Sequence, residues 1–179
     1  MPLIVAGGVW DKKDIDRFMD MGCSGVQMAT RFIGTFECDA HMTFKRVIMA
    51  SKKRDIRLIK SPVGYPARGI VTTPLVERVT AGHRPKITCI SNCVTPCNHG
   101  QESNLVGYCI ADALGDAQRG VMETGLFFSG SNGYRVTRLQ PVQELMEKLV
   151  GLREDADSWE EDPDYVEMPD HPTAAVSAL

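Results

Sequence analysis

The chain has 179 residues, of which 43% are hydrophobic and 7% aromatic, and its formal net charge at pH 7 is -3. This length and composition suit one globular domain with a buried core and exclude wholesale disorder. No apolar run approaches the roughly 18 residues of a membrane span, and the first residues lack the basic region of a signal peptide. We therefore expect a cytoplasmic protein, in which cysteines stay thiols or bind ligands rather than form disulfides.

The charges are distributed unevenly along the chain. Residues 153–179 contain nine acids and one base, whereas bases outnumber acids in residues 1–152. An acidic, proline-containing end is typical of a solvated, weakly ordered tail, which we expect for residues 153–179. The small positive excess of the remainder suits an anionic small molecule and is too weak to indicate nucleic acid.

The opening segment alternates strand, helix and strand. Residues 3–6 form a short apolar run, the pattern of a strand buried on both faces, and residues 25–29 form a second one. Between them, Asp11 can cap a helix that ends near Gly22. A strand, a helix of about ten residues and a strand predict a βαβ unit with parallel neighbouring strands.

Further elements follow at short intervals. Apolar spacing and helix-start signals predict helices at residues 38–51, 75–80, 105–118 and after Pro141. Short apolar runs predict strands at residues 56–59 and 125–128. Turns at residues 61–64 and 129–132 either shape a pocket or are ordinary turns. Residues 82–104 form a long polar connection, of the kind that often acts as a functional lid.

Residues suited to an anion follow both opening strands. The carboxyl ends of parallel strands meet at one edge of a sheet, where ligands commonly bind. Glycines allow a close approach to backbone N–H groups, while threonine and glutamine add a hydroxyl and an amide donor. The candidate binding residues are Gly7, Gly8, Gln27, Met28, Ala29 and Thr30. A Gly-Gly pair after a strand is also common in plain turns, so this signal alone is weak.

Four separated motifs resemble the nitronate monooxygenase family, formerly called 2-nitropropane dioxygenases and related to the flavin-dependent enoyl-acyl-carrier-protein reductases. Residues 3–32, which run from LIVAGG to GVQMATRF, resemble the family's strand 7–helix–strand 8 region, with Ala29 in place of the usual glycine. The other motifs, in the family's order, are IKSPVGYPARGI (59–70), YCIADAL (108–114) and GLFFSGSNGYRV (125–136). The resemblance covers about residues 1–150.

The resemblance implies an α/β fold, formed by the last two strands of a (β/α)8 TIM barrel and a smaller helical substrate-side region. With the acidic tail (153–179) assigned from composition, it divides the chain into barrel strands with the phosphate site (1–36), a substrate-side region with a cysteine-containing loop (37–137) and a C-terminal helix (138–152). It also implies FMN as the cofactor, with its phosphate held by the six candidate residues, and oxidation of alkyl nitronates with O2.

The resemblance places the other barrel strands, and the histidine that serves as general base, before residue 1. None of the four histidines, His41, His83, His99 and His171, matches that base, so the catalytic residues are unknown. We expect a complementary N-terminal half-barrel chain or a homo-oligomer as partner, and no nucleic acid or membrane. The alternatives are an enzyme like the flavin-dependent enoyl-acyl-carrier-protein reductases and an inactive, truncated remnant.

Cysteines lie in and beside the long connection. Cys89, Cys93 and Cys97 are each separated by three residues, and Cys109 follows. This spacing matches neither the usual zinc patterns nor the common iron–sulfur patterns. We favour a loop that packs over the flavin, with a structural metal site as the alternative.

Overall fold

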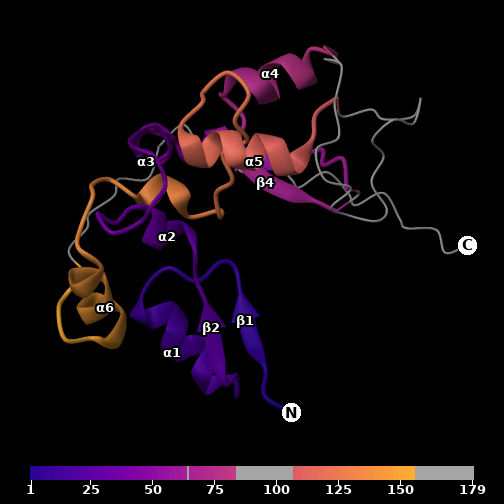
Figure 1. Cartoon of the computed structure of the whole chain (residues 1–179). Coiled ribbons are helices and arrows are strands. Elements are labelled where there is room, and N and C mark those ends of the chain that lie inside the picture. Colours follow the sequence, from indigo (N-terminus) through magenta and orange to yellow (C-terminus); the bar gives the residue numbers. More distant parts are fainter. Residues whose placement is uncertain (64, 84–106, 156–179) are drawn as a thin grey trace, which may run out of the picture.

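The computed structural model describes residues 1–63, 65–83 and 107–155. It opens with strand β1 (Ile4–Ala6), helix α1 (Lys12–Asp20) and strand β2 (Gly25–Gln27). The two strands are parallel, with Val5 opposite Val26. The predicted βαβ unit is therefore confirmed, and Figure 1 shows it at one end of the molecule, beside the N-terminus.

Helix α1 begins and ends where its local sequence predicts. The Asp11 side chain accepts a hydrogen bond from the Asp14 backbone N–H, and the Asp14 carboxylate accepts one from the Trp10 N–H. These two bonds satisfy N–H groups at a helix start, where no intrahelical acceptor exists. At the other end, Gly22 has a φ of +92°, a left-handed conformation that glycine adopts without steric cost.

The burial expected for the two strands is wrong. Leu3 and Ile4 are 56% and 64% exposed, and α1 contains no buried residue. The reason is the size of the sheet. Within the described residues β1 pairs only with β2, so the other edge of β1 has no neighbouring strand. An apolar run thus indicates a buried strand only where the rest of the sheet is present to cover it.

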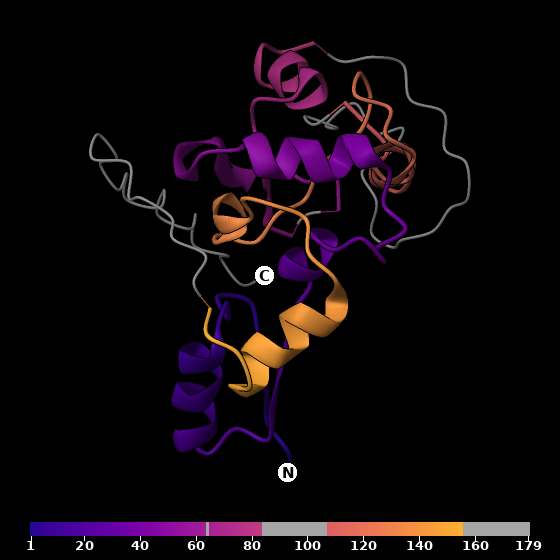
Figure 2. The same ribbon diagram turned by 90° about the vertical axis from the view of Figure 1, so that its left-hand side faces the viewer.

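Most of the remaining described chain forms helices and a hairpin on the far side of this unit from the N-terminus, and the last helix returns beside the unit (Figure 1 and Figure 2). These elements are α2 (Thr30–Ile33), α3 (Met42–Ala50), β3 (Ile56–Ile59), β4 (Ala67–Ile70), α4 (Pro74–Thr80), α5 (Ile110–Arg119) and α6 (Val142–Val150). Strands β3 and β4 pair antiparallel. Short 3₁₀ turns occupy Lys53–Asp55 and Gly133–Arg135.

Most of the predicted elements are confirmed, with shifted ends. Strand β3 and helices α4 and α6 lie where they were expected, whereas α3 and α5 are shorter than the predicted 38–51 and 105–118. Helix α2 and strand β4 were not predicted. Helix α2 has only four residues, about one turn, which is too short to show a helical periodicity. Strand β4 has the sequence ARGI, which lacks the apolar run that marked β3.

Residues 125–128, predicted as a strand, form only an isolated bridge between Phe128 and Gly69. The Leu126 N–H, two residues before this bridge, donates to the Ala113 carbonyl of α5, so the backbone there bonds to the helix and not to β4. The segment is apolar because it is core: Leu126 and Phe127 are completely buried. A short apolar run does not distinguish a strand from an irregular core segment.

The hydrophobic core lies mainly in this larger, helical part. One cluster contains Trp10, Ile48, Ile56, Ile70, Ala117, Phe127 and Val136, and the second contains Leu75, Val76, Tyr108, Ala113 and Leu126. The rings of Phe44 and Phe127 meet edge to face at 5.1 Å. Trp10 is the contribution of the βαβ unit to these clusters, so it anchors the loop after β1 to the core.

Helix α6 comes last in the described chain and lies beside the βαβ unit, where it packs against α1 (Figure 2). Its residues Leu145 and Leu149 are buried, which the predicted helical spacing requires. The first residues after α6 form ion pairs, whereas residues 156–179 of the predicted acidic tail lie outside the described residues. Over the described part of the chain, no helix has the length and apolar character needed to cross a membrane.

Candidate functional site

Three loops surround one cavity of about 310 Å³. The first loop follows β1 (residues 6–10), the second follows β2 (residues 27–31), and the third is formed by residues 130–133. Because β1 and β2 are parallel, their carboxyl ends lie at the same edge, and the loops that follow them converge. All six candidate binding residues line this site cavity.

The β1 loop contains two glycines in the left-handed conformation. Gly7 and Gly8 have φ values of +86° and +73°, and a Cβ added to either would meet no atom within 4 Å. Glycine is therefore favoured here by the backbone conformation and not by crowding. Both residues are exposed, so their backbone atoms are accessible from the site cavity.

The β2 loop contributes a hydroxyl that is already oriented. Thr30 Oγ1 accepts a hydrogen bond of 2.8 Å from the Gly130 N–H, which leaves the hydroxyl hydrogen able to donate to a ligand. Ala29 has a φ of −132°, so this position does not require the positive φ that favours glycine. Alanine in place of the usual glycine therefore meets no left-handed strain here.

The third loop is joined to the other two. Besides the Gly130–Thr30 bond, the Asn132 side-chain amide donates a long hydrogen bond of 3.5 Å to the Gly8 carbonyl. Of the two turns that could shape a pocket, residues 130–132 do line the site cavity, whereas residues 61–63 do not. The contact between Asn132 and Gly8, which are 124 positions apart, has no local signal in the sequence.

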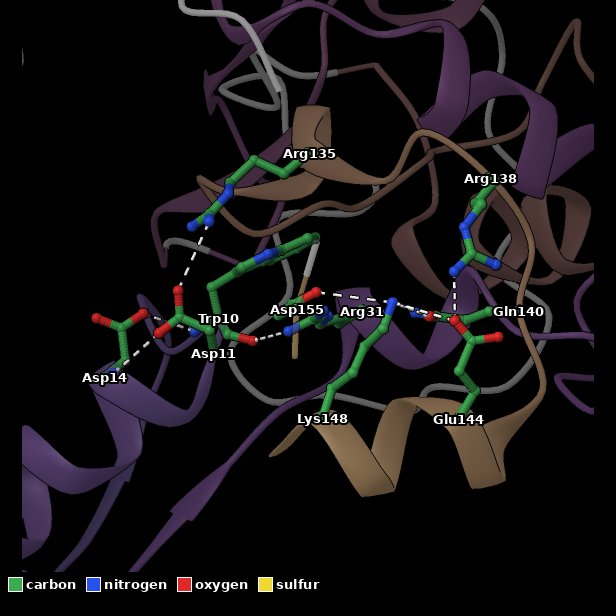
Figure 3. Close-up of polar contacts among 10 residues, drawn as sticks. All are labelled: Trp10, Asp11, Asp14, Arg31, Arg135, Arg138, Gln140, Glu144, Lys148 and Asp155. Atoms are coloured by element: carbon green, nitrogen blue, oxygen red, sulfur yellow. Dashed lines mark hydrogen bonds and ion pairs between the residues drawn. The ribbon is translucent and has the colours of Figure 1, made fainter. Parts of the chain in front are cut away.

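Sequence reasoning missed Trp10 and two arginines beside the site cavity. Figure 3 shows the Trp10 ring between Arg31 and Arg135, whose guanidinium carbons lie 4.9 and 5.1 Å from the ring centroid. Arg31 Nη1 also donates a hydrogen bond of 2.6 Å to the Trp10 carbonyl, and Arg135 pairs with Asp11 at 3.6 Å. Cation–π contacts and this hydrogen bond hold the end of the β1 loop in place.

A charged network continues from Arg31 to helix α6 (Figure 3). Asp155 pairs with Arg31 at 2.5 Å and with Lys148 at 3.7 Å, and Lys148 pairs with Glu144 at 3.2 Å. Hydrogen bonds, the larger from Arg138 and the other from Lys148, hold the pKa of Glu144 below its usual value. Alternating charges therefore compensate one another from the site cavity to the surface of α6.

Other candidate groups lie away from the site cavity. His41 precedes α3, where Nδ1 accepts a hydrogen bond from the Thr43 N–H, and neither His41 nor His83 lines the cavity. Cys109 is a free thiol. The described residues contain no group of three potential metal ligands, and Cys89, Cys93, Cys97, His99 and His171 lie outside them.

Part of this chain is similar in sequence to known proteins. A "Probable nitronate monooxygenase" of Staphylococcus saprophyticus is 37% identical over 70 residues, which cover 39% of this chain and 20% of that protein. One of Bacillus subtilis is 34% identical over 77 residues, 43% of this chain and 22% of that protein. The matched segment thus spans about a fifth of the length of these curated relatives.

Solved structures share the fold. FabK from Thermotoga maritima superposes with a TM-score of 0.64 at 24% identity, over 84% of this chain and 43% of that chain. A nitroalkane oxidase from Streptomyces ansochromogenes gives a TM-score of 0.57 at 22% identity, over 84% of this chain and 39% of that chain. These likenesses support the α/β fold, of which this chain contains a part.

The sequence model of one family, described as nitronate monooxygenase, matches residues 1–151. The match includes all three loops of the site cavity and every element from β1 to α6. This chain belongs to the nitronate monooxygenase family.

Proposed function

We propose that this chain is the phosphate-binding part of an FMN-dependent oxidoreductase, and that the site cavity holds the FMN phosphate. The observation that carries the proposal is the convergence of the Gly7–Gly8 loop and the Met28–Thr30 loop on one cavity. Gly7 and Gly8 expose backbone beside the cavity, and the Thr30 hydroxyl can donate to a phosphate oxygen.

The cavity has the chemical character that a dianion requires. No acidic residue is among the described residues that line it, and Arg31 lies at its edge. The remaining polar groups are backbone amides, the Gln27 and Asn132 amides and the Thr30 and Ser131 hydroxyls, all of which can donate hydrogen bonds. The residues present therefore fit a phosphate group.

When bound, FMN would supply the electron transfer for oxidation of alkyl nitronates with O2, while the chain supplies binding and orientation. The three loops would hold the phosphate at one rim of a parallel sheet. We place the isoalloxazine ring and the general base against parts of a TIM barrel that this chain does not contain, because the matched region spans 39–43% of the solved structures.

We also propose that the open edge of β1 takes a parallel strand from a complementary half-barrel. Leu3 and Ile4 are exposed there, beside a strand edge that has no neighbour among the described residues. An exposed apolar edge of this kind pairs readily with another strand. Mixing the chain with the complementary half should raise nitronate-dependent O2 uptake, whereas NADH-dependent reduction of an enoyl thioester without such uptake would contradict the substrate assignment.

The phosphate site is tested by Gly8→Ala, with Gly22→Ala as the matched control. Both glycines have positive φ, and neither Cβ would meet an atom within 4 Å, so both substitutions cost about 1–2 kcal/mol of backbone strain. Of these two glycines, Gly8 lines the site cavity and Gly22 does not. Loss of one or two hydrogen bonds to a charged phosphate should weaken binding by roughly 10- to 100-fold in Gly8→Ala alone.

Binding is measured by calorimetric titration of the full chain with FMN and with inorganic phosphate, and stability by urea unfolding. Gly22→Ala should lose stability and keep the affinity of the parent chain. Equal affinities in the two variants, or no binding of either ligand by the parent, would remove the phosphate site from these loops.

A further inference from the structure

Asp155 lies beyond the family match, which ends at residue 151. Helix α6 ends at Val150, and Gly151, with a φ of +81°, follows it as the C-cap. The next residues run back beside the βαβ unit (Figure 2). The Asp155 side chain is 21% exposed and reaches Arg31, which is 124 positions earlier in the sequence. The segment after α6 thus contributes a carboxylate that pairs with Arg31, one of the residues that line the site cavity.

The Arg31 guanidinium connects this carboxylate to the β1 loop. Nη2 donates to Asp155 Oδ2 at 2.5 Å, and Nη1 donates to the Trp10 carbonyl at 2.6 Å. The Arg31 side chain is 2% exposed, so its charge is removed from water and depends on protein partners. Charge-assisted hydrogen bonds in such surroundings are stronger than neutral ones.

Trp10 in turn determines where the Gly7–Gly8 turn lies. Its N–H donates to the Asp14 carboxylate, and its carbonyl accepts from Arg31, so both sides of this residue are held. Trp10 follows Gly8 by two positions and belongs to the core cluster. A displacement of Arg31 would therefore be transmitted through the Trp10 carbonyl to the glycine backbone beside the site cavity.

We propose that Asp155 is a positioning residue for the phosphate site: its carboxylate holds the Arg31 guanidinium, which holds the Trp10 carbonyl and so the Gly7–Gly8 backbone. The inference rests on the proposed function. It assigns Arg31 to the support of the loop rather than to direct phosphate contact, because its two terminal nitrogens are directed to Trp10 and Asp155.

The cations around Asp155 explain why its negative charge matters. Lys148 Nζ lies 3.7 Å from the second carboxylate oxygen, Oδ1, and its side chain is 3% exposed. Lys148 also contacts Gln140 at 3.0 Å and Glu144 at 3.2 Å. In Asp155→Asn, Arg31 and Lys148 face a neutral amide instead of an anion, and their mutual repulsion displaces Arg31 from the Trp10 carbonyl.

Trp10 provides a readout that does not depend on the cofactor. The chain has two tryptophans, so in a Trp159→Phe background all indole fluorescence comes from Trp10. Asp155→Asn should shift the Trp10 emission to longer wavelength, increase its quenching by acrylamide and weaken FMN and phosphate binding by about tenfold. Asp155→Glu, which keeps the charge, should give intermediate values for all three.

Glu147→Gln is the matched control, because Glu147 pairs with Arg153 on the outside of α6 and does not line the site cavity. It should leave emission, quenching and binding unchanged. If Asp155→Asn does not fold, as judged by far-UV circular dichroism, Asp155→Glu carries the test.

The outcomes separate the two proposals. If the parent binds FMN or phosphate and Asp155→Asn leaves both Trp10 and the affinity unchanged, the positioning role is overturned and the proposed function stands. If the parent binds neither ligand, the proposed function falls and the positioning of a phosphate falls with it. An equal loss of affinity in Glu147→Gln would show a general charge effect and also overturn the role of Asp155.

Discussion

Alanine at position 133 tests how the third loop is packed against the site cavity. A Cβ on Gly133 would lie 1.9 Å from Ser129 Oγ, far inside any van der Waals contact, and 3.2 Å from Thr30 Cγ2. Gly133 and Ser129 are both buried, so the loop has little room to adjust. Inserting a methyl group into such a site costs about 1–3 kcal/mol of unfolding free energy.

Removal of the Ser129 hydroxyl should relieve most of this clash. Ser129→Ala alone loses a hydrogen bond of 3.1 Å to the Gly130 carbonyl, worth about 1 kcal/mol. In the double variant the shortest remaining contacts of the new Cβ are 3.2 Å to Thr30 and 3.3 Å to Ile56, which small shifts can accommodate. The double variant should therefore be about 1–2 kcal/mol more stable than the sum of the single variants predicts.

Urea unfolding followed by far-UV circular dichroism measures the four free energies of this cycle. An equal slope of unfolding free energy against urea concentration in all four proteins would show that the substitutions change stability and not the compactness of the unfolded state. Additive effects, within about 0.5 kcal/mol, would refute the predicted contact between Gly133 and Ser129 and the packing of the loop derived from it.

Two further predictions concern the core. Burial raises the pKa of Tyr108 from 10.0 to about 12, so the stability that its neutral form confers is complete below pH 10 and is lost as the pH rises towards 12. Tyr108→Phe removes the 2.9 Å hydrogen bond to the Lys60 carbonyl and should lower the free energy of unfolding by about 1 kcal/mol at pH 7. It should also make the loss of stability between pH 10 and 12 shallower. An equally steep loss in urea unfolding of the variant would contradict this. Leu126→Ala should cost about 2–5 kcal/mol, measured as a lower urea midpoint, because Leu126 is completely buried; a loss below about 1 kcal/mol would contradict its place in the core.

Local signals determined the first part of the structure from sequence alone. Asp11 and Gly22 mark the ends of α1 because capping and left-handed conformations depend on residues within one turn of the helix. The Gly7–Gly8 turn and the residues after β2 are likewise contiguous in the chain, so their motif and their family resemblance could be recognised without a structure.

Other features depended on contacts between distant segments. The apolar run of residues 125–128 was compatible with a strand, and only the bond from Leu126 to Ala113 of α5 made it an irregular core segment. The exposure of β1 was equally hidden, because an apolar sequence does not show whether a neighbouring strand is there to cover it.

The candidate site shows the same division. Its six predicted residues belong to two short motifs, and the sequence determined that they would follow parallel strands. Only the tertiary structure brought Asn132 to Gly8 and Asp155 to Arg31, across 124 positions in each case. Hydrogen bonds and ion pairs of this range leave no periodicity or spacing in the sequence, because their partners become neighbours only when the core between them has formed.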